Sequence, residues 1–593
     1  MSETLQTSVL IVGGAGAGLA SSIFLTELGI DTHLIERRET TSPAPKAHYL
    51  NLRSMEIFRS LGLADEIYER STPAENMATV GWYTSLAGDG ELDGKTIHIM
   101  DAFGGGALAE HYGESSPCRT ANFAQLHVEP FLYAHAEKRI SKREVASSLH
   151  FGHELVSFFE NELGVLATIR NTANDETYTV QAKYMLACDG GRFVGPSLNI
   201  PMQGIERLID MKTAYFRADL SSFIDDDSPM IRWFSNPESG GAWGSGVMVA
   251  LGPKDFGRNS QEWLMHFAFN PDQIENVEHE ELAEQIKSLL RVTAETKVEI
   301  IKTNEWQVKG VLADRFRQGS VFLLGDAAHC HPPTTGLGLN SAIQDAHNMA
   351  WKLAAVIKGE ASDSLLDTYE SERRQVTGKN VRWALYTFQN HLLIDGGIGL
   401  IPGAPVEMNT QAYRNLFEDS EIGDTLRHRA KLVIDTQTAE FQAINMEIGF
   451  KYQLGALHKD GHESTEREMF ERRYYPCTDP GARFPHFWLN NNGKNLSSLD
   501  LITIDSFTLF VEKNVEQWSA LVGRSPLANK CHVVAIGAGA AQMKPLNDDW
   551  NQFKYIGDNG AVLVRPDGHV MWRSKDASGM ARFIDELSGF FKS

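Results

Sequence analysis

The sequence predicts an α/β fold in which a Rossmann-like domain is interleaved with a mixed-sheet domain and followed by a small C-terminal α/β domain. Three observations predict it. Apolar strand-like runs lead into glycine-rich turns and helical patterns at 8–28 and again at 321–353. Between them, 213–251 contains short strand-like stretches separated by glycine-rich turns. From 449 to 593, strand-like and helix-like stretches alternate.

The first unit begins with Ser8–Val12, a nearly continuous apolar run typical of a strand buried on both faces. A turn of small residues follows, consisting of Gly13, Gly14, Ala15, Gly16, Ala17 and Gly18. A helical pattern then leads to a second strand, Thr32–Ile35, which ends at Glu36. This order predicts a dinucleotide-binding unit, because small residues let the backbone approach a pyrophosphate and the helix N-terminus offers free N–H groups. Glu36 would accept hydrogen bonds from a ribose, and Ala15 replaces the middle glycine of the usual pattern.

A basic loop comes next. Lys46-Ala47-His48 follow two prolines and precede a helical pattern at 54–61. Lys46 is either a phosphate contact or a solvated loop lysine, and the residues alone leave both alternatives open.

A second ligand-facing pattern lies far along the chain. The apolar strand Val321–Leu324 ends in Gly325-Asp326-Ala327-Ala328-His329, and two prolines stiffen the following loop. Gly336-Leu337-Gly338-Leu339-Asn340 then opens an amphipathic helix over 341–353. Asp326 could bind sugar-like hydroxyls, and the N–H groups of Gly338 to Asn340 could hold a carbonyl. The alternative is a tight strand-to-helix connection with a capping acid.

The middle of the chain is expected to be sheet-rich, with strands at 213–220, 230–234 and 242–251 and a helix at 280–290. It carries several large apolar residues, which either line a pocket or pack a core: Trp233, Phe234, Trp243, Met248 and Phe269. Helices are expected at 373–393 and 411–447. The Gly/Pro-rich loop between them, 395–405, is expected at the edge of an active site or at a subunit contact.

Composition excludes several classes of function. The net charge of −22 argues against nucleic acid and an anionic membrane surface as partners, because both need basic patches. The five cysteines form no CxxC pair, which speaks against a zinc cluster and a disulfide framework. There is no signal-like N-terminus and no long uninterrupted apolar run, so we expect a cytoplasmic protein. His329 and His331 lack further clustered ligands, so no metal is expected.

In order and spacing, these motifs resemble the single-component FAD-dependent aromatic hydroxylases. The resemblance rests on Gly13–Gly18, Cys188-Asp189-Gly190 and above all Gly325-Asp326-Ala327-Ala328-His329. It extends to Gln125-Leu126-His127-Val128-Glu129-Pro130 and to Leu366-Asp367-Thr368-Tyr369-Glu370. Nearly the whole chain is similar to the phenol 2-monooxygenase and 2,4-dichlorophenol 6-monooxygenase subgroup. That subgroup has a thioredoxin-like C-terminal domain, which here has no CxxC and is expected to be structural.

The resemblance implies roles for individual residues. FAD would contact Gly13 to Gly18, Glu36, Arg37, Lys46, Gln125, Asp189, Asp326, Pro333, Gly338, Leu339 and Asn340. Lys46 stands where the family usually has an arginine that touches the pyrophosphate and NADPH, so that contact is expected to be weaker here. Phe193 and Pro196 replace the end of the family's Asp-Gly motif, so the resemblance does not define the NADPH site precisely. The substrate pocket would include Trp233, Trp243, Met248 and Pro333.

The resemblance also implies a domain division. Residues 1–190 and 300–395 would form the FAD domain, and 191–299 with part of 75–120 would form the substrate sheet. A helical connection at 396–448 and the C-terminal domain at 449–593 complete it.

The implied reaction is hydroxylation of a phenolic ring by a flavin C4a-hydroperoxide, with O2 and NADPH or NADH as co-substrates. His48 is the candidate for a residue that accepts the phenolic proton, or it merely hydrogen-bonds flavin or backbone. An alternative is epoxidation or Baeyer–Villiger oxidation of a polycyclic natural product. A second alternative is an FAD-binding interaction module without activity. We expect a homodimer.

Overall fold

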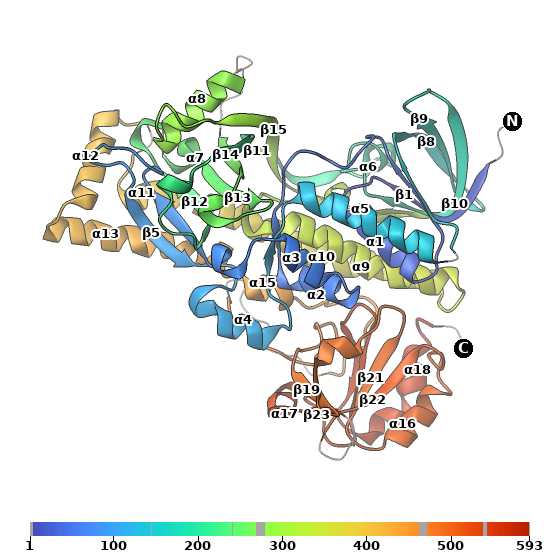
Figure 1. Ribbon diagram of the computed structural model, residues 1–593. Coiled ribbons are helices and arrows are strands. Elements are labelled where there is room, and N and C mark those ends of the chain that lie inside the picture. The colour runs from blue at the N-terminus through green and yellow to red at the C-terminus, as the bar shows by residue number, and fades with distance from the viewer. Residues whose placement is uncertain are drawn as a thin grey trace.

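The computed structural model describes residues 4–143, 145–239, 241–268, 279–401, 403–461, 471–537 and 543–591. Phe269, named above, lies outside the described residues. For Trp243 only the backbone is described. Figure 1 shows two sheet-centred units side by side, with the C-terminal unit below them.

The first sheet is the Rossmann-like one. Its strand order is β16-β17-β10-β1-β2-β7, and the pairs along β17-β10-β1-β2-β7 are parallel. The strands are β1 (Leu5–Val12), β2 (Thr32–Glu36), β7 (Ser148–Phe151), β10 (Thr177–Ala187), β16 (Arg317–Gln318) and β17 (Val321–Leu323), with the antiparallel hairpin β8 (His153–Asn161) and β9 (Gly164–Asn171) joined to β10. The strands are apolar because both faces of the sheet are buried. The helices α1 (Gly16–Glu27), α5 (Gln125–Lys142) and α9 (Leu337–Ile357) form one layer, in which α1 contacts both others, and the β8–β9 hairpin adds apolar side chains to the same core.

The second sheet is largely antiparallel and has the order β18-β15-β11-β14-β13-β12-β4-β5. Its strands are β4 (Thr79–Tyr83), β5 (Thr96–Asp101), β11 (Met202–Arg217), β12 (Pro229–Phe234), β13 (Val247–Gly252), β14 (Glu262–Ala268), β15 (Glu299–Ala313) and β18 (His329–Cys330). The expected strand at 242–251 is in fact a helical turn, α7 (Ala242–Ser245), followed by β13. β15 pairs with β11 over most of its length, which groups 299–313 with this sheet rather than with the first one.

Side chains alternate between the two faces of this sheet. One face packs against α8 (His279–Leu290). The other packs against the short strand β3 (Tyr49–Leu50), the start of α5, and the helices α11 (Leu392–Ile398), α12 (Val406–Phe417) and α13 (Glu421–Ile434). Because α11 covers 392–398, the first part of the expected loop at 395–405 is helical.

Two long helices, α9 and α10 (Ser364–Asn390), run between the sheets and the C-terminal unit (Figure 1). The C-terminal unit has a four-stranded sheet of order β22-β21-β24-β25, in which β21 and β22 are parallel and the other pairs antiparallel, as in a thioredoxin-like fold. Its strands are β21 (Phe507–Val511), β22 (Cys531–Ala535), β24 (Ala561–Val564) and β25 (Val570–Ser574), beside a small sheet of β19 (Trp488–Asn491), β20 (Lys494–Ser497) and β23 (Met543–Pro545).

The remaining elements are short. They are α2 (Leu52–Ser60), α3 (Ala64–Arg70), α4 (Ala109–Ser115), β6 (Ala121–Asn122), α6 (Val194–Ser197), α14 (Thr438–Phe441), α15 (Ile444–Ile448), α16 (Val515–Val522), α17 (Asp549–Phe553) and α18 (Phe583–Leu587). Among the described residues, no helix combines the length and apolar character needed to cross a membrane.

Candidate active site: a dinucleotide cavity beside a polar sheet face

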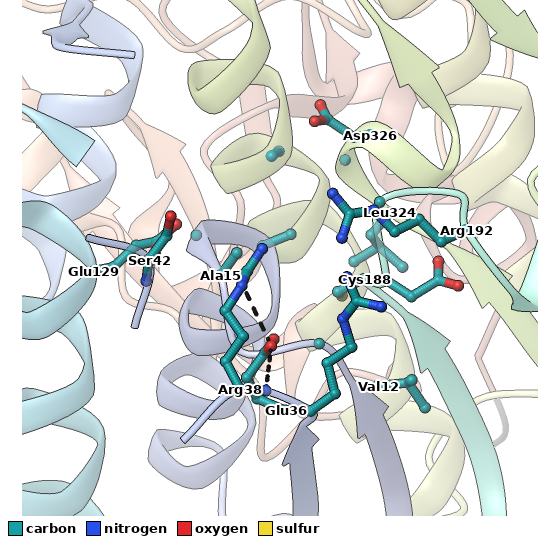
Figure 2. A pocket seen from close by; sticks show the side chains of 18 of the residues that line it. Val12, Ala15, Glu36, Arg38, Ser42, Glu129, Cys188, Arg192, Leu324 and Asp326 are labelled. Carbon is teal, nitrogen blue, oxygen red and sulfur yellow. Dashed lines mark hydrogen bonds and ion pairs between the residues drawn. The ribbon is translucent and has the colours of Figure 1, made fainter. Parts of the chain in front are cut away.

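A cavity of about 390 Å³ opens at the carboxyl ends of β1, β2, β10 and β17. Each strand contributes its last residue or the residue directly after it to the lining: Val12, Glu36, Cys188 and Leu324. Figure 2 shows side chains from these strand ends arranged around one space. Ligands of open α/β sheets bind at this edge, because all parallel strands end there.

The first wall of the cavity is the glycine-rich turn before α1. Gly13 has φ +112°, and a Cβ there would lie 2.2 Å from the Cys188 carbonyl oxygen, so only glycine fits. A Cβ on Gly18 would lie 1.9 Å from the Gly13 carbonyl oxygen, which explains the third glycine of the motif. Ala15 is the N-cap of α1 with an extended backbone (φ −92°, ψ −168°), a conformation that any L-residue adopts. The missing middle glycine therefore costs no backbone strain.

The second wall is the start of α9. Gly336 is its left-handed N-cap, and a Cβ on Gly338 would meet nothing within 4 Å. Neither α1 nor α9 has a side-chain cap at its N-terminus in the part of the chain that the structure describes, and neither has an acid in its first turn. Two helix N-termini with free N–H groups and partial positive charge thus line one cavity, which suits an anionic ligand.

Three acids lie at the ends of neighbouring strands, but they differ in how their oxygens are used. Glu36 accepts from Gly14 N at 2.8 Å and from Arg38 N at 3.0 Å. Asp189 accepts from Gly191, Phe193 and Val194 backbone N–H groups at 2.8–3.1 Å and so holds its own turn. The Asp326 side chain is exposed to the cavity and has no hydrogen-bond partner among the described residues.

Cations and amides complete the lining. Lys46 and Arg37 are exposed at its rim. Gln125 begins α5, donates to Glu129 at 2.6 Å and accepts from Ala47 N at 3.4 Å. Burial raises the pKa of Glu129, which moderates the negative charge at this wall.

The cavity thus brings together most of the predicted cofactor residues. They are Gly13, Ala15, Gly16, Ala17, Glu36, Arg37, Lys46, Gln125, Asp189, Asp326, Gly338 and Leu339. Gly14, Gly18, Pro333 and Asn340 are not in its wall. The Asn340 side chain is buried and fully used, since it accepts from Asn51 N at 3.0 Å and donates to the carbonyls of Tyr49 and Gly336.

Sequence reasoning missed other lining residues. Arg38 directly follows Arg37, Arg192 lies three residues after Asp189, and Glu129 lies one helical turn after Gln125, so local spacing could have indicated these three. Ser42, His153, Glu154 and Leu155 carried no such signal. The last three begin β8, which is joined to the first sheet through β9.

His48 lies just beyond the cavity, between Lys46 and β3. Its carbonyl accepts from Phe123 N at 2.7 Å, and its Nδ1 lies 3.0 Å from Asn122 Oδ1. Asn122 Nδ2 reaches the Ala250 carbonyl at 3.3 Å and Thr72 Oγ1 at 2.8 Å. A carbonyl only accepts, so that nitrogen is the amide NH2 and Oδ1 is an acceptor. His48 therefore carries its proton on Nδ1 and presents an unprotonated Nε2.

The environment keeps His48 neutral. Desolvation of the half-buried ring lowers its pKa to about 4, and the Asn122 contact opposes this only in part. At neutral pH the Nε2 lone pair is free to accept a proton.

The proposed pocket residues divide between the two sheet faces. Trp233 is on the face shared with Tyr49, and its ring stacks on His391 at 4.4 Å. Met248 is on the opposite face, fully buried against the residues packed under α8. Strand alternation thus places Met248 away from His48, and we do not retain it as a pocket residue. Pro333 is exposed before the turn that leads into α9.

Two uncapped helix N-termini, a free strand-end carboxylate and a parallel sheet define a dinucleotide-binding flavoprotein site. The FAD binding domain family matches residues 6–384, and the aromatic-ring hydroxylase C-terminal family matches 478–591. The chain belongs to the FAD-dependent aromatic-ring hydroxylases, and it is an FAD-dependent monooxygenase.

Relatives extend over the whole chain. The 2,4-dichlorophenol 6-monooxygenase of Delftia acidovorans is 31% identical, covering 99% of this chain and 98% of its own. A putative polyketide hydroxylase of Streptomyces halstedii is 32% identical, covering 96% and 94%. The crystal structure of the flavin-dependent monooxygenase PieE in complex with FAD and substrate superposes with a TM-score of 0.90 at 32% identity and 99% coverage of both chains.

The residues present fit FAD. The two helix N-termini offer N–H groups for the pyrophosphate, the space over Gly338 admits a ring close to the backbone, and the free Asp326 carboxylate suits polyol hydroxyls. NAD(P)H is the reductant typical of the family.

Proposed function

We propose that the protein hydroxylates an aromatic ring that carries a phenolic hydroxyl, and that His48 accepts the phenolic proton. One observation supports this above the others, namely that the Asn122 contact leaves His48 Nε2 as a neutral acceptor next to the FAD cavity. Transfer breaks the phenol O–H bond and forms the N–H bond at Nε2. The ring gains electron density at the positions next to and opposite the oxygen.

The remaining parts of the chain bind and orient. The turn at Gly13–Gly18 and the start of α9 would hold FAD, and Asp326 would hold its ribityl chain. Asn340 ties β3, and with it His48, to the start of α9, so the base and the cofactor loop keep one relative position. When bound and reduced, FAD supplies the activated oxygen, expected as a C4a-hydroperoxide.

The organisation of the molecule is part of the proposal. The FAD unit would comprise 1–190 and the segment that resumes after β15 and runs to 395. The substrate sheet would comprise 191–313 with 75–120, followed by the helical connection to 448 and the C-terminal unit. We propose a cytoplasmic homodimer.

A second candidate is oxygenation of a polycyclic natural product, by epoxidation or Baeyer–Villiger insertion. The relatives named putative polyketide hydroxylase and aklavinone 12-hydroxylase, at 32% and 29% identity, support its substrate class, although both are named for hydroxylation.

The experiment that separates them uses purified protein saturated with FAD. NAD(P)H oxidation is followed with simple phenols, polycyclic phenols and non-phenolic polyketides, and product and hydrogen peroxide are both measured. A hydroxylated phenol supports the proposal. An epoxide or lactone favours the second candidate, and oxidation that no ligand stimulates overturns both.

A further inference from the structure

A second histidine points to the face of the second sheet on which β3 and His48 lie. His266 is on β14, where it pairs with Thr213 of β11 and Val247 of β13. Leu264, two residues earlier on the same face, packs in the cluster that contains Tyr49. His266 therefore points to the face of the second sheet on which β3 and His48 lie, and its ring is half-buried.

The protonation of His266 follows from its contacts. Its Nδ1 lies 2.7 Å from Thr213 Oγ1, and Thr213 Oγ1 accepts from Trp306 Nε1 at 3.0 Å. Thr213 is buried, and among the described residues its hydroxyl hydrogen has no other acceptor than His266 Nδ1. The threonine must donate to satisfy that hydrogen, so Nδ1 is the acceptor and His266 carries its proton on Nε2.

The two histidines thus have opposite tautomers. His48 offers a lone pair at Nε2, and His266 offers an N–H at Nε2. Within the described residues, neither Nε2 has a hydrogen-bond partner. The pKa of His266 falls to about 3, chiefly because of desolvation and in smaller part because of His48.

Because His48 is a weak base, a second group is needed that stabilises the phenolate, and the N–H of His266 can serve as that group. A base with a pKa of about 4 does not hold a phenolic proton unless the phenolate is stabilised as well. A hydrogen bond donated to the phenolate oxygen supplies part of that stabilisation, and a neutral donor does so without competing for the proton.

We infer that His266 is a substrate-recognition residue that donates from Nε2–H to the phenolic oxygen while His48 accepts its proton. The inference rests on the proposed function. The pair would select a ring hydroxyl by matching one donor and one acceptor to it, so a methyl ether, which cannot donate, loses the His48 contact. Glu262, further along the same face, is held by Tyr215 and by Arg217 at 2.8 Å, so the nearest acid on β14 is already engaged.

The test compares His266→Phe with His266→Gln. Phenylalanine keeps the ring but removes the donor, whereas the glutamine NH2 can reach the position of Nε2. The matched control is Phe267→Leu, which disturbs the same strand on the face toward α8. Dissociation constants come from the flavin difference spectrum of FAD-saturated enzyme titrated with phenol, with more acidic halogenated phenols and with the methyl ether.

The expected result is that His266→Phe weakens phenol binding about tenfold, the equivalent of one hydrogen bond to a charged group. The loss should shrink as the phenol becomes more acidic and should be smaller for the methyl ether, whose oxygen still accepts but carries no charge. It should be largely restored in His266→Gln. Phe267→Leu should leave the affinities for phenol, the halogenated phenols and the methyl ether unchanged, or lower all of them by the same factor.

Unchanged phenol affinity in His266→Phe, or an equal loss for phenols and the ether, overturns the inference while turnover of phenols by the unaltered protein preserves the proposed function. If the unaltered protein binds and hydroxylates no phenol, the proposed function fails first, and the inference fails with it.

Discussion

Asp189 and Asp326 show how one residue type serves two purposes at neighbouring strand ends. Asp189 accepts three backbone N–H groups, so its charge stabilises a turn. Asp326 is exposed and has no partner among the described residues, so its charge is available to a ligand. A glycine-flanked acid after a strand therefore indicates a site, but only the contacts say which acid binds.

Asp326→Asn should weaken FAD binding about tenfold, because hydrogen bonds to a charged acceptor are worth more than those to a neutral one. Thermal unfolding of the FAD-free protein should not change. Asp189→Asn is the matched control, since its NH2 would face backbone N–H groups and should lower the unfolding temperature even without FAD. Flavin fluorescence titration measures the first effect, and an Asp326→Asn protein with unaltered FAD affinity would contradict it.

His48→Asn should reduce phenol-dependent kcat/KM about 100-fold, within the range of a lost general base. FAD content and the slow NAD(P)H oxidation without phenol should remain. Because the His48 pKa is about 4, kcat/KM of the unaltered enzyme should stay flat as the pH falls from 8 to 5. An acid limb near the ordinary histidine pKa of 6.5 would contradict the lowered pKa of His48.

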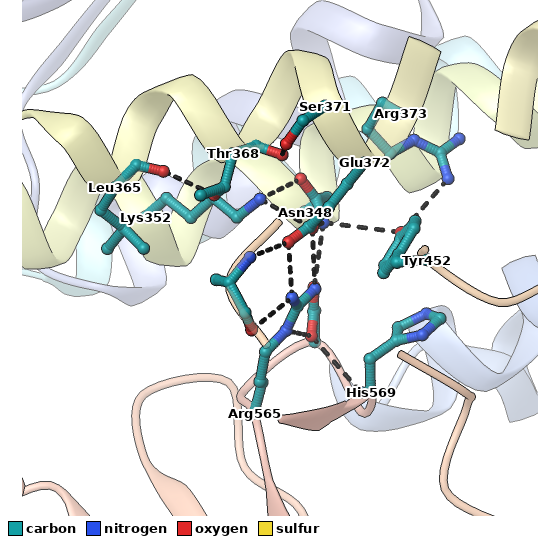
Figure 3. Close-up of polar contacts among 12 residues, drawn as sticks. Asn348, Lys352, Leu365, Thr368, Ser371, Glu372, Arg373, Tyr452, Arg565 and His569 are labelled. Atoms are coloured by element: carbon teal, nitrogen blue, oxygen red, sulfur yellow. Dashed lines mark hydrogen bonds and ion pairs between the residues drawn. The ribbon is translucent and has the colours of Figure 1, made fainter. Parts of the chain in front are cut away.

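At the scale of elements, α9 and α10 join the cofactor loop to the C-terminal unit through buried charges. On α10, Glu372 binds Lys352 of α9 at 2.8 Å and Arg565 of the C-terminal unit at 2.7 and 2.9 Å. Asp567 also binds Arg565, so two cations balance two anions (Figure 3). All four side chains are almost fully buried.

The same helices reach the FAD cavity. Arg373, next to Glu372, donates to Asp345 of α9 at 2.7 Å. Asp345 in turn accepts from Gly325 N at 3.1 Å and pairs with His329 at 2.7 Å. The position of the Gly325-Asp326 loop therefore depends on packing between α9, α10 and the unit below them.

Arg565→Met should lower the free energy of unfolding by about 3 kcal/mol, because it leaves a buried carboxylate uncompensated. Adding Glu372→Gln should recover part of the loss, since Lys352 and Asp567 then balance. The free energy of coupling between the two substitutions is measured by denaturant unfolding of the FAD-saturated single and double variants.

The control pair is Arg573→Met with Glu372→Gln. Arg573 is buried in the same unit, but its carboxylate partners are Asp460 and Asp479, so the two changes should be additive. Additivity in the Arg565 cycle as well would contradict direct coupling across α10.

Elements defined by local pattern were predictable, whereas their partners were not. The β1–turn–α1 unit and the turn before α9 follow from glycines and apolar periodicity within short segments. Periodicity also separates the faces of β13, but it does not say which face meets α8, so Met248 was assigned to the wrong side. His153 reaches the cavity through long-range strand pairing that no local pattern encodes.

At the scale of the whole molecule, acidic residues outnumber basic ones, while buried histidines are expected to determine how folding stability depends on pH. The net charge is −22, yet seven histidines with strongly lowered pKa values are distributed over all three units. They are His33, His266, His347 and His569, with pKa values of about 3, His48 and His486, with values of about 4, and His331, whose pKa lies well below the ordinary value. In each case desolvation is the largest cause, because the interior disfavours the imidazolium form.

This distribution sets the sign of the pH dependence. Between about pH 4 and 6.5 the unfolded chain binds protons at these histidines and the folded chain does not, so folding stability rises with pH across that window. Glu447 acts in the opposite direction, since burial raises its pKa to about 7 and its contribution is lost as pH rises toward that value. Glu129 and Asp395 also have raised pKa values, but the histidines outnumber these carboxyl groups.

The unfolding temperature of FAD-saturated protein should therefore fall as the pH is lowered from 7 to 5, while most surface carboxylates stay ionised. His347→Gln should make this dependence shallower, because glutamine does not titrate and His347 lies on α9, where its ring packs against Phe24 at 5.1 Å. His532→Gln is the matched control on an exposed position of β22 and should leave the slope unchanged. A constant or rising unfolding temperature between pH 7 and 5 would contradict a net control of the pH dependence by these histidines.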